Sequence, residues 1–133
     1  MISIVDYGLG NVKAFFNVYH RLGITCSIAS KKEDFHHTSH IILPGVGAFD
    51  HAVRQLELSG MKDVLNELVV NKGTPVLGVC VGMQMMGLNS EEGIEKGLGW
   101  INVEVKKLKS QINNAPFSLP HMGWNEVSVD GDN

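Results

Sequence analysis

The sequence predicts an α/β fold built on a doubly wound, mainly parallel sheet. Short apolar segments alternate with segments whose apolar residues recur at helical spacing, as in parallel strands joined by crossover helices. Three pairs of glycines directly follow apolar segments, and such turns mark the carboxyl edge of an open sheet, where α/β proteins place their binding sites. These two observations predict both the fold class and the edge at which function lies.

Four apolar segments are the expected strands. The first is rich in β-branched residues and ends before Gly8, and the third ends at Pro44. The four segments cover residues 2–7, 24–29, 40–44 and 75–80. Because helical patterns separate most of them, they are expected to run parallel to one another.

Segments with helical periodicity connect these strands. The first follows Asn11, a residue type that caps helix N-termini, and ends at Gly23. The expected helices cover residues 12–22, 48–60, 61–73 and 81–88. The polar segment 31–39 is expected to form a loop or a short exposed helix.

The pattern changes after residue 88. A polar, glycine-rich loop leads into residues 100–109, which alternate apolar and polar side chains as a half-exposed strand does. Another short strand is expected over residues 125–129. We therefore expect added antiparallel strands near the C-terminus of a single domain that spans residues 1–133.

Composition excludes several classes of function. The 44% apolar and 19% charged residues are ordinary for a folded protein, and a net charge of −3 without a basic stripe argues against nucleic-acid binding. No apolar run approaches the roughly 20 residues of a membrane span, and the N-terminal segment lacks the features of a signal peptide. The two cysteines form no disulfide framework, so a reducing cytoplasmic location is expected. No histidine cluster predicts a metal site.

The stretch 78-GVCVG-82 places a cysteine between two glycines where an expected strand meets an expected helix. This matches the elbow of α/β enzymes, in which a nucleophile occupies a strained turn and its neighbours two residues away must be tiny. The start of the following helix favours the thiolate, and the Val81 N–H is placed to stabilise an oxyanion. The structural alternative is a buried cysteine, a common core residue. The strand-to-helix context favours the nucleophile.

A second loop, 43-LPGVG-47, also follows an expected strand. A Pro-Gly-x-Gly loop can present backbone N–H groups to a developing negative charge. Taken alone, this loop is equally explained as a plain turn, because glycine and proline punctuate loops of every kind.

Taken together, four blocks resemble class I glutamine amidotransferases, and among them most closely the glutaminase subunits of imidazole glycerol phosphate synthases in histidine biosynthesis. The blocks are 5-VDYGLGN-11, 43-LPGVGAFDHAV-53, 77-LGVCVGMQMM-86 and 119-LPHMGWNEV-127. The resemblance covers the whole chain as the N-terminal two-thirds of such a domain, and it implies a flavodoxin-like fold without a cofactor.

The resemblance also implies roles for individual residues. Cys80 would attack the side-chain amide of glutamine, a glutamyl thioester would form as ammonia leaves, and water would then release glutamate. The N–H groups of Val46, Gly47 and Val81 would form the oxyanion hole, and Gly47 and Gln84 would help to hold the glutamine.

The ammonia would pass to a partner, a (β/α)8-barrel cyclase subunit that makes imidazole glycerol phosphate, or to another ammonia-accepting subunit. The residues implied at or near the interface with this partner are Asn11, His121, Met122 and Trp124.

The sequence departs from the family in one respect. The family activates its cysteine with a histidine oriented by a glutamate, both in a His-Pro-Glu segment near the C-terminus, and these 133 residues contain no such segment. We therefore expect a fragment or truncated product that lacks full glutaminase activity by itself. The six histidines lie in no matching motif; they are His20, His36, His37, His40, His51 and His121.

Three alternatives share part of the pattern. Paralogous subunits supply ammonia for amidino sugars of bacterial surface polysaccharides, and the stretch 97-GLGWINVEV-105 is similar to theirs. A non-catalytic docking or regulatory protein would keep the fold without the base. A cysteine elbow also serves redox sensing or deglycation, but the Met-Gln after the elbow and the block 119–127 argue against this.

Overall fold

A parallel four-stranded sheet organises the computed structural model, which describes residues 1–108, 123–124 and 126–128. The strand order is β2-β1-β3-β4, and every neighbouring pair is parallel. The strands are β1 (Ile2–Val5), β2 (Cys26–Ala29), β3 (His40–Leu43) and β4 (Val76–Gly78). This order confirms the predicted doubly wound sheet and matches the first four strands of the flavodoxin-like arrangement.

Helices connect the strands on both faces of the sheet. Asn11 caps the first helix, because its Oδ1 accepts a hydrogen bond from the Ala14 N–H at 3.1 Å, as predicted. The α-helices are α1 (Val12–Arg21), α2 (Phe49–Leu58), α3 (Lys62–Asn66) and α4 (Val81–Met85). A 3-10 turn, η1 (Lys32–Phe35), precedes β3, and a π-helical turn, η2 (Glu67–Asn71), continues α3.

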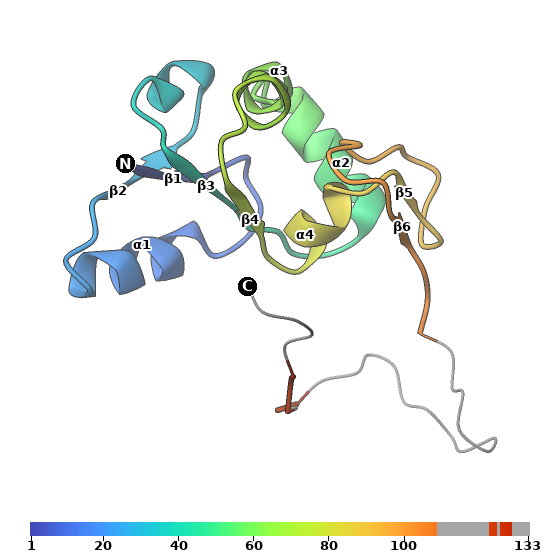
Figure 1. The fold of residues 1–133 in the computed structure, drawn as a ribbon. Helices are drawn as coiled ribbons and strands as arrows, with labels where there is room; N and C mark the ends of the chain where they lie inside the picture. Colours follow the sequence, from blue (N-terminus) through green and yellow to red (C-terminus); the bar gives the residue numbers. More distant parts are fainter. Residues whose placement is uncertain (109–122, 125, 129–133) are drawn as a thin grey trace.

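Alternation along the strands divides the core into two parts. Ile4 and Ile42 pack with Val12 of α1 on one face of the sheet. Val5 and Leu43, their neighbours in sequence, face the other side, where α2, α3 and α4 form the larger core. Figure 1 shows this arrangement, with α1 alone on one side of the sheet and the other three α-helices opposite.

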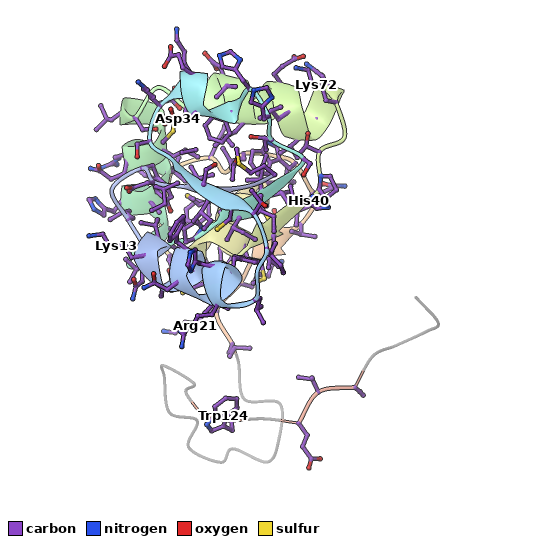
Figure 2. All side chains as sticks on the ribbon, turned by 90° about the vertical axis from the view of Figure 1, so that its left-hand side faces the viewer. Lys13, Arg21, Asp34, His40, Lys72 and Trp124 are labelled. Atoms are coloured by element: carbon purple, nitrogen blue, oxygen red, sulfur yellow. The ribbon has the colours of Figure 1, made fainter. Side chains whose placement is uncertain are left out.

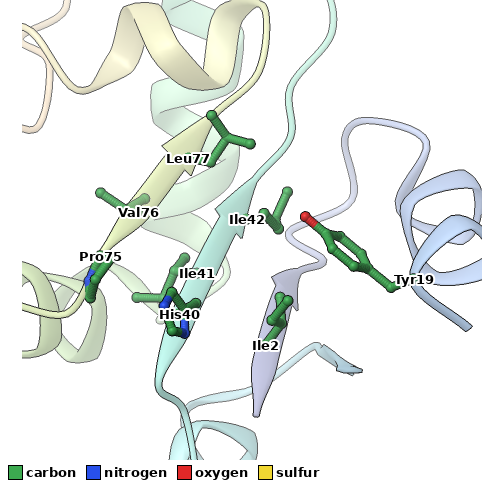
Figure 3. A pocket seen from close by; sticks show the side chains of 8 residues that line it. All are labelled: Ile2, Tyr19, His40, Ile41, Ile42, Pro75, Val76 and Leu77. Atoms are coloured by element: carbon green, nitrogen blue, oxygen red, sulfur yellow. The ribbon is translucent and has the colours of Figure 1, made fainter. Parts of the chain in front are cut away.

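The face that α1 covers remains partly open beside β4. A hollow of about 240 Å³ lies there between Tyr19 of α1 and the strands, lined further by Ile42 and Leu77, whose side chain is 55% exposed (Figure 3). Its other lining residues are Ile2, His40, Ile41, Pro75 and Val76. None of these residues belongs to a glycine turn at the carboxyl edge of the sheet.

The region after α4 differs from prediction. Strands β5 (Asn89–Ser90) and β6 (Glu104–Val105) form a separate two-stranded sheet, and they pair in parallel. The expected antiparallel pairing is therefore wrong for the described residues. The loop between the two strands, 91–103, is long enough to return the chain to the starting end, which a tight hairpin cannot do. Of the strand expected over residues 125–129, residues 126–128 are described and form no strand. Residues 109–122, 125 and 129–133 lie outside the described residues.

Charged and titratable side chains lie on several sides of the described chain. Figure 2 labels Lys13, Arg21, Asp34, His40 and Lys72 on different sides of this body. Among the described residues, no helix has the length and apolar character needed to cross a bilayer. No group of three or more potential metal-ligating side chains occurs in the part of the chain that the structure describes.

Candidate active site

Three turns meet at the carboxyl edge of the sheet. The amino-terminal loop (residues 6–11) follows β1, the Pro44 loop (residues 44–48) follows β3, and the Cys80 turn (residues 78–82) spans the end of β4. Because β2 and β3 flank β1, the chain reverses its winding direction between β1 and β3. Open α/β sheets bind ligands at such a switch point. The amino-terminal and Pro44 loops border this switch point, and the Cys80 turn lies beside the Pro44 loop.

Glycines allow these turns to touch backbone against backbone. A Cβ on Gly82 would lie 2.0 Å from the Leu43 carbonyl oxygen, and one on Gly45 would lie 2.6 Å from the Gly82 nitrogen. A Cβ on Gly10 would meet the Pro44 Cβ at 2.9 Å. Real Cβ atoms do not approach other atoms this closely. The three turns are therefore one packed unit, and a side chain at any of these glycines would separate them.

Cys80 occupies the strained position that the sequence predicts for a nucleophile. Its φ of 57° and ψ of −125° make it the one non-glycine residue with positive φ in the described part of the chain. Such a conformation costs about 1–3 kcal/mol and persists only where surrounding structure enforces it. Close packing at Gly78 helps to enforce the conformation of Cys80, since a Cβ on Gly78 would lie 2.5 Å from the Met83 Cα. The prediction of tiny neighbours two residues either side is confirmed.

The thiol of Cys80 is open to solvent, unlike a core cysteine. Cys80 is exposed, whereas Cys26 is half-buried with its Sγ 3.9 Å from the Phe16 carbonyl oxygen. Both are free thiols. The structural alternative of a buried Cys80 is therefore wrong, and Cys80 lies exposed at the carboxyl edge of the sheet.

The three predicted oxyanion donors carry unused N–H groups. Within the described chain, the backbone N–H groups of Val46, Gly47 and Val81 donate no hydrogen bond. Val81 is the first residue of α4, and the first N–H groups of a helix have no partner within it. Val46 is 55% exposed, and Gly47 has a φ of 90°, which a side chain would disfavour. These donors remain available to a negatively charged oxygen.

Tyr7 joins the amino-terminal loop to the Pro44 loop, a contact that sequence reasoning missed. Its side chain is buried, and its hydroxyl donates a hydrogen bond to the Pro44 carbonyl oxygen at 2.8 Å. Burial, and secondarily the nearby charge of Cys80, raise the pKa of Tyr7 to about 12. The phenol thus stays protonated and keeps its proton for Pro44. A tyrosine directly after a buried strand and before a glycine loop was the available signal.

Asp50 on α2 is a second residue that sequence reasoning missed. Its carboxylate accepts hydrogen bonds from the Ile94 and Glu95 N–H groups at 3.1 and 3.0 Å. These backbone donors lower the pKa of Asp50, with a smaller contribution from Arg54, which itself pairs with Glu95 at 2.8 Å. Asp50 therefore fastens the loop that follows β5 onto the helix after the Pro44 loop.

The other predicted site residues are Gln84, predicted to bind glutamine, and four residues predicted at the interface with a partner. Gln84 lies on α4, one turn after Cys80, and is half-buried. Asn11 is exposed, with its side chain engaged in the α1 cap, and Trp124 is fully exposed at 104% (Figure 2). His121 and Met122 lie outside the described residues.

No histidine is placed against the thiol by the described residues. Among residues 1–108, 123–124 and 126–128, no side chain makes a hydrogen bond with Cys80. His40 bonds instead with the Ser39 hydroxyl at 3.0 Å, at the opposite end of β3. The described part of the chain thus has a thiol on a strained backbone and backbone N–H groups without partners, but no side chain hydrogen-bonded to the Cys80 Sγ.

Curated relatives are similar along nearly the whole chain. A protein of Bdellovibrio bacteriovorus named imidazole glycerol phosphate synthase subunit HisH is 49% identical over 127 residues, which are 96% of this chain and 62% of the relative. A protein of the same name from Leptospira interrogans is 47% identical over 133 residues, 100% of this chain and 65% of the relative. The chain thus spans 62–65% of the length of these relatives.

A solved structure and a family model agree with this similarity. A crystal structure described as a glutamine amidotransferase superposes with a TM-score of 0.64 at 21% identity, covering 79% of this chain and 55% of that one. At this identity, the superposition supports the fold alone. The model of the family described as glutamine amidotransferase class-I matches residues 3–130. With that match over nearly its full length, and a cysteine elbow beside unused backbone donors, the chain belongs to the class I glutamine amidotransferase family.

Proposed function

We propose that this chain, as the N-terminal two-thirds (residues 1–133) of a type 1 glutamine amidotransferase domain, provides the nucleophile and oxyanion site of a glutaminase that hydrolyses glutamine to glutamate and ammonia. The observation that carries the proposal is Cys80, an exposed thiol at positive φ beside three unused N–H donors. Membership of the amidotransferase family supports glutamine as the substrate.

The chemistry follows from this arrangement. The Cys80 Sγ attacks the side-chain amide carbon of glutamine, and the amide oxygen takes the negative charge of the tetrahedral intermediate. The C–N bond then breaks, ammonia leaves with a proton from a general acid, and a glutamyl thioester remains on Cys80. Water adds to the thioester carbonyl, and the C–S bond breaks to release glutamate. Cys80 must be a free thiol at the start of each turnover, so a reducing compartment such as the cytoplasm suits this reaction.

The backbone donors stabilise the charge that develops on the oxygen. In our proposal the N–H groups of Val46, Gly47 and Val81 serve as the oxyanion hole, and Gly47 and Gln84 help to hold the glutamine. Preorganised donors of this kind contribute about 100- to 1,000-fold in rate each. The close packing of the Pro44 loop on the Cys80 turn supports this role, because it fixes the donors relative to the thiol.

The released ammonia passes, in this proposal, to an acceptor subunit in a heterodimer. Relatives that are 45–49% identical are named as a subunit of imidazole glycerol phosphate synthase, which favours a cyclase of histidine biosynthesis, a (β/α)8 barrel, over an amidino-sugar enzyme. Asn11, His121, Met122 and Trp124 are the proposed interface residues. The complete exposure of the Trp124 indole supports this for that residue, since tryptophan is favoured at interface hot spots.

Glutamate release tests the proposal. The natural polypeptide, in the form produced in its own cell and assayed with its acceptor subunit, is expected to convert glutamine to glutamate. Cys80→Ala is expected to abolish this conversion while leaving the fold intact. Cys26→Ala is the matched control, because Cys26 is half-buried in β2 and away from the carboxyl edge. A Cys80→Ala protein that retained wild-type turnover would show that the nucleophile lies elsewhere.

A further expectation concerns residues 1–133 by themselves. Because no described side chain bonds to the Cys80 thiol, we propose that these residues alone turn glutamine over poorly. Turnover equal to that of the polypeptide from its cell, and abolished by Cys80→Ala, would contradict this part of the proposal.

A further inference from the structure

We propose that Tyr7 is a positioning residue of the amidotransferase reaction: its hydroxyl holds the Pro44 loop against the Cys80 turn, so that the loop's N–H groups meet the oxyanion. The inference rests on the proposed glutaminase function, because it assigns Tyr7 a task within that site. Tyr7 touches no reacting atom in this proposal; it acts through the backbone of Pro44.

The contacts of Tyr7 support a task of this kind. Its hydroxyl donates to the Pro44 carbonyl oxygen at 2.8 Å, and it lies 3.0 Å from where a Gly45 Cβ would stand. Gly45 in turn packs on the elbow, since its Cβ would be 2.5 Å from the Val81 Cγ1. The tyrosine hydroxyl, the Pro44 loop and the start of α4 therefore form one continuous contact, with the predicted donors Val46 and Gly47 immediately beyond it.

The Pro44 loop otherwise has few hydrogen bonds of its own. Proline has no N–H to donate, and the N–H groups of Gly45, Val46 and Gly47 donate none within the described chain. The bond from Tyr7 is thus the hydrogen bond that holds this carbonyl from outside the loop. It is also buried, where a lost partner leaves the Pro44 oxygen without water to replace it.

The Tyr7 hydroxyl stays protonated near neutral pH and so remains a hydrogen-bond donor. Burial raises the pKa of Tyr7 to about 12, and the charge of Cys80 acts in the same direction. A neutral phenol also adds no negative charge beside a thiolate. The hydroxyl is therefore a permanent donor to Pro44 rather than a candidate general base.

The alternative is that Tyr7 is a core aromatic whose hydroxyl only satisfies a buried carbonyl. Tyr7→Phe separates the two, because it keeps the ring in the core and removes only the hydroxyl. The chain offers a matched control in its one other tyrosine. Tyr19 lies on the opposite face of the sheet, beside the hollow in Figure 3, and its hydroxyl makes no hydrogen bond within the described residues.

The experiment measures glutamate release by the natural polypeptide, in the form produced in its own cell, together with its acceptor subunit. For Tyr7→Phe we expect kcat to fall about five- to tenfold, the effect of one lost hydrogen bond, with KM within about twofold of wild type. Tyr19→Phe is expected to change neither. Backbone 15N order parameters provide a readout without turnover: those of Val46 and Gly47 should drop in Tyr7→Phe towards ~0.6, below the ~0.85 of rigid backbone. Those of Cys80 should stay unchanged.

Each outcome decides a different point. Wild-type kcat and order parameters in Tyr7→Phe would overturn the proposal, as would a kcat loss equal to that of Tyr19→Phe. A Tyr7→Phe protein that did not fold would also overturn it, because the hydroxyl would then serve the whole fold. If the wild-type protein released no glutamate, yet the Val46 and Gly47 order parameters fell, the loop-holding role would stand and the glutaminase proposal would fail.

Discussion

Gly82→Ala perturbs the candidate site through one methyl group. That group would be placed 2.0 Å from the Leu43 carbonyl oxygen and 3.0 Å from the Pro44 carbonyl carbon, both backbone atoms that cannot rotate away. The first contact must open by about 1 Å before it reaches even 3.0 Å, the closest approach that a real Cβ makes. The Cys80 turn therefore has to move relative to β3 and the Pro44 loop.

The expected losses differ for stability and for activity. Overpacking costs about 1–3 kcal/mol, and alanine in place of glycine within a helix regains about 1 kcal/mol. The net decrease in the free energy of unfolding is thus about 0–2 kcal/mol. A shift of about 1 Å between nucleophile and oxyanion donors costs about 100-fold in rate. Activity should therefore fall far more than stability.

Two assays on the same variant separate these effects. Urea unfolding gives the change in free energy, and glutamate release gives kcat. Gly60→Ala is the matched control: Gly60 has a φ of 71° and open space around its Cβ position, so it loses about 1–2 kcal/mol from strain without touching the site. A Gly82→Ala protein with wild-type kcat, or a Gly60→Ala protein with the same loss of kcat, would show that the contact of Gly82 with β3 does not position the site.

Three further predictions concern the turn, the loop after β5 and the larger core. Cys80→Gly should raise the free energy of unfolding by about 1 kcal/mol, because glycine adopts the φ of 57° without strain, while glutamate release is lost; urea unfolding and the release assay measure both. Asp50 has a lowered pKa in the folded chain, so its ionised form stabilises the fold above its ordinary value of 3.8 and this contribution disappears as pH falls through the folded pKa. Asp50→Asn should remove that pH-dependent part of the stability, which urea unfolding between about pH 2 and 6 would detect as a flatter profile. Trp100→Phe should cost about 1 kcal/mol in thermal or urea unfolding, because it removes the 2.8 Å bond from the indole N–H to the Asn66 Oδ1.

Much of the sheet is predictable because its signals are local. Each of the four strands expected for the main sheet contains the observed one, and the Asn11 cap lies where the residue type predicts it. The elbow is predictable because its glycines lie at a fixed spacing around Cys80: Gly78 is required by a contact with nearby Met83, although the contacts that require Gly82 are with Leu43 and Pro44. A short window of sequence carries this information.

Contacts between distant segments are not predictable in this way. The bond from Tyr7 to Pro44 depends on β1 and β3 being neighbours, which no single window of sequence shows. The parallel pairing of β5 and β6 was missed because alternation gives the exposed face of a strand but not its direction. The end of α4 illustrates the same limit: the helix was expected to reach residue 88, but it ends at Met85.

Covalent trapping shows most directly whether the Cys80 thiol attacks glutamine. A diazoketone analogue of glutamine alkylates a nucleophilic thiol with loss of N2, so the modified protein is digested and the adduct located by mass spectrometry. We expect one adduct, on Cys80. Excess glutamine should slow its formation, and Tyr19→Phe should leave its rate unchanged. An adduct distributed equally between Cys80 and Cys26, or formation that glutamine does not slow, would show that Cys80 is not the nucleophile for glutamine.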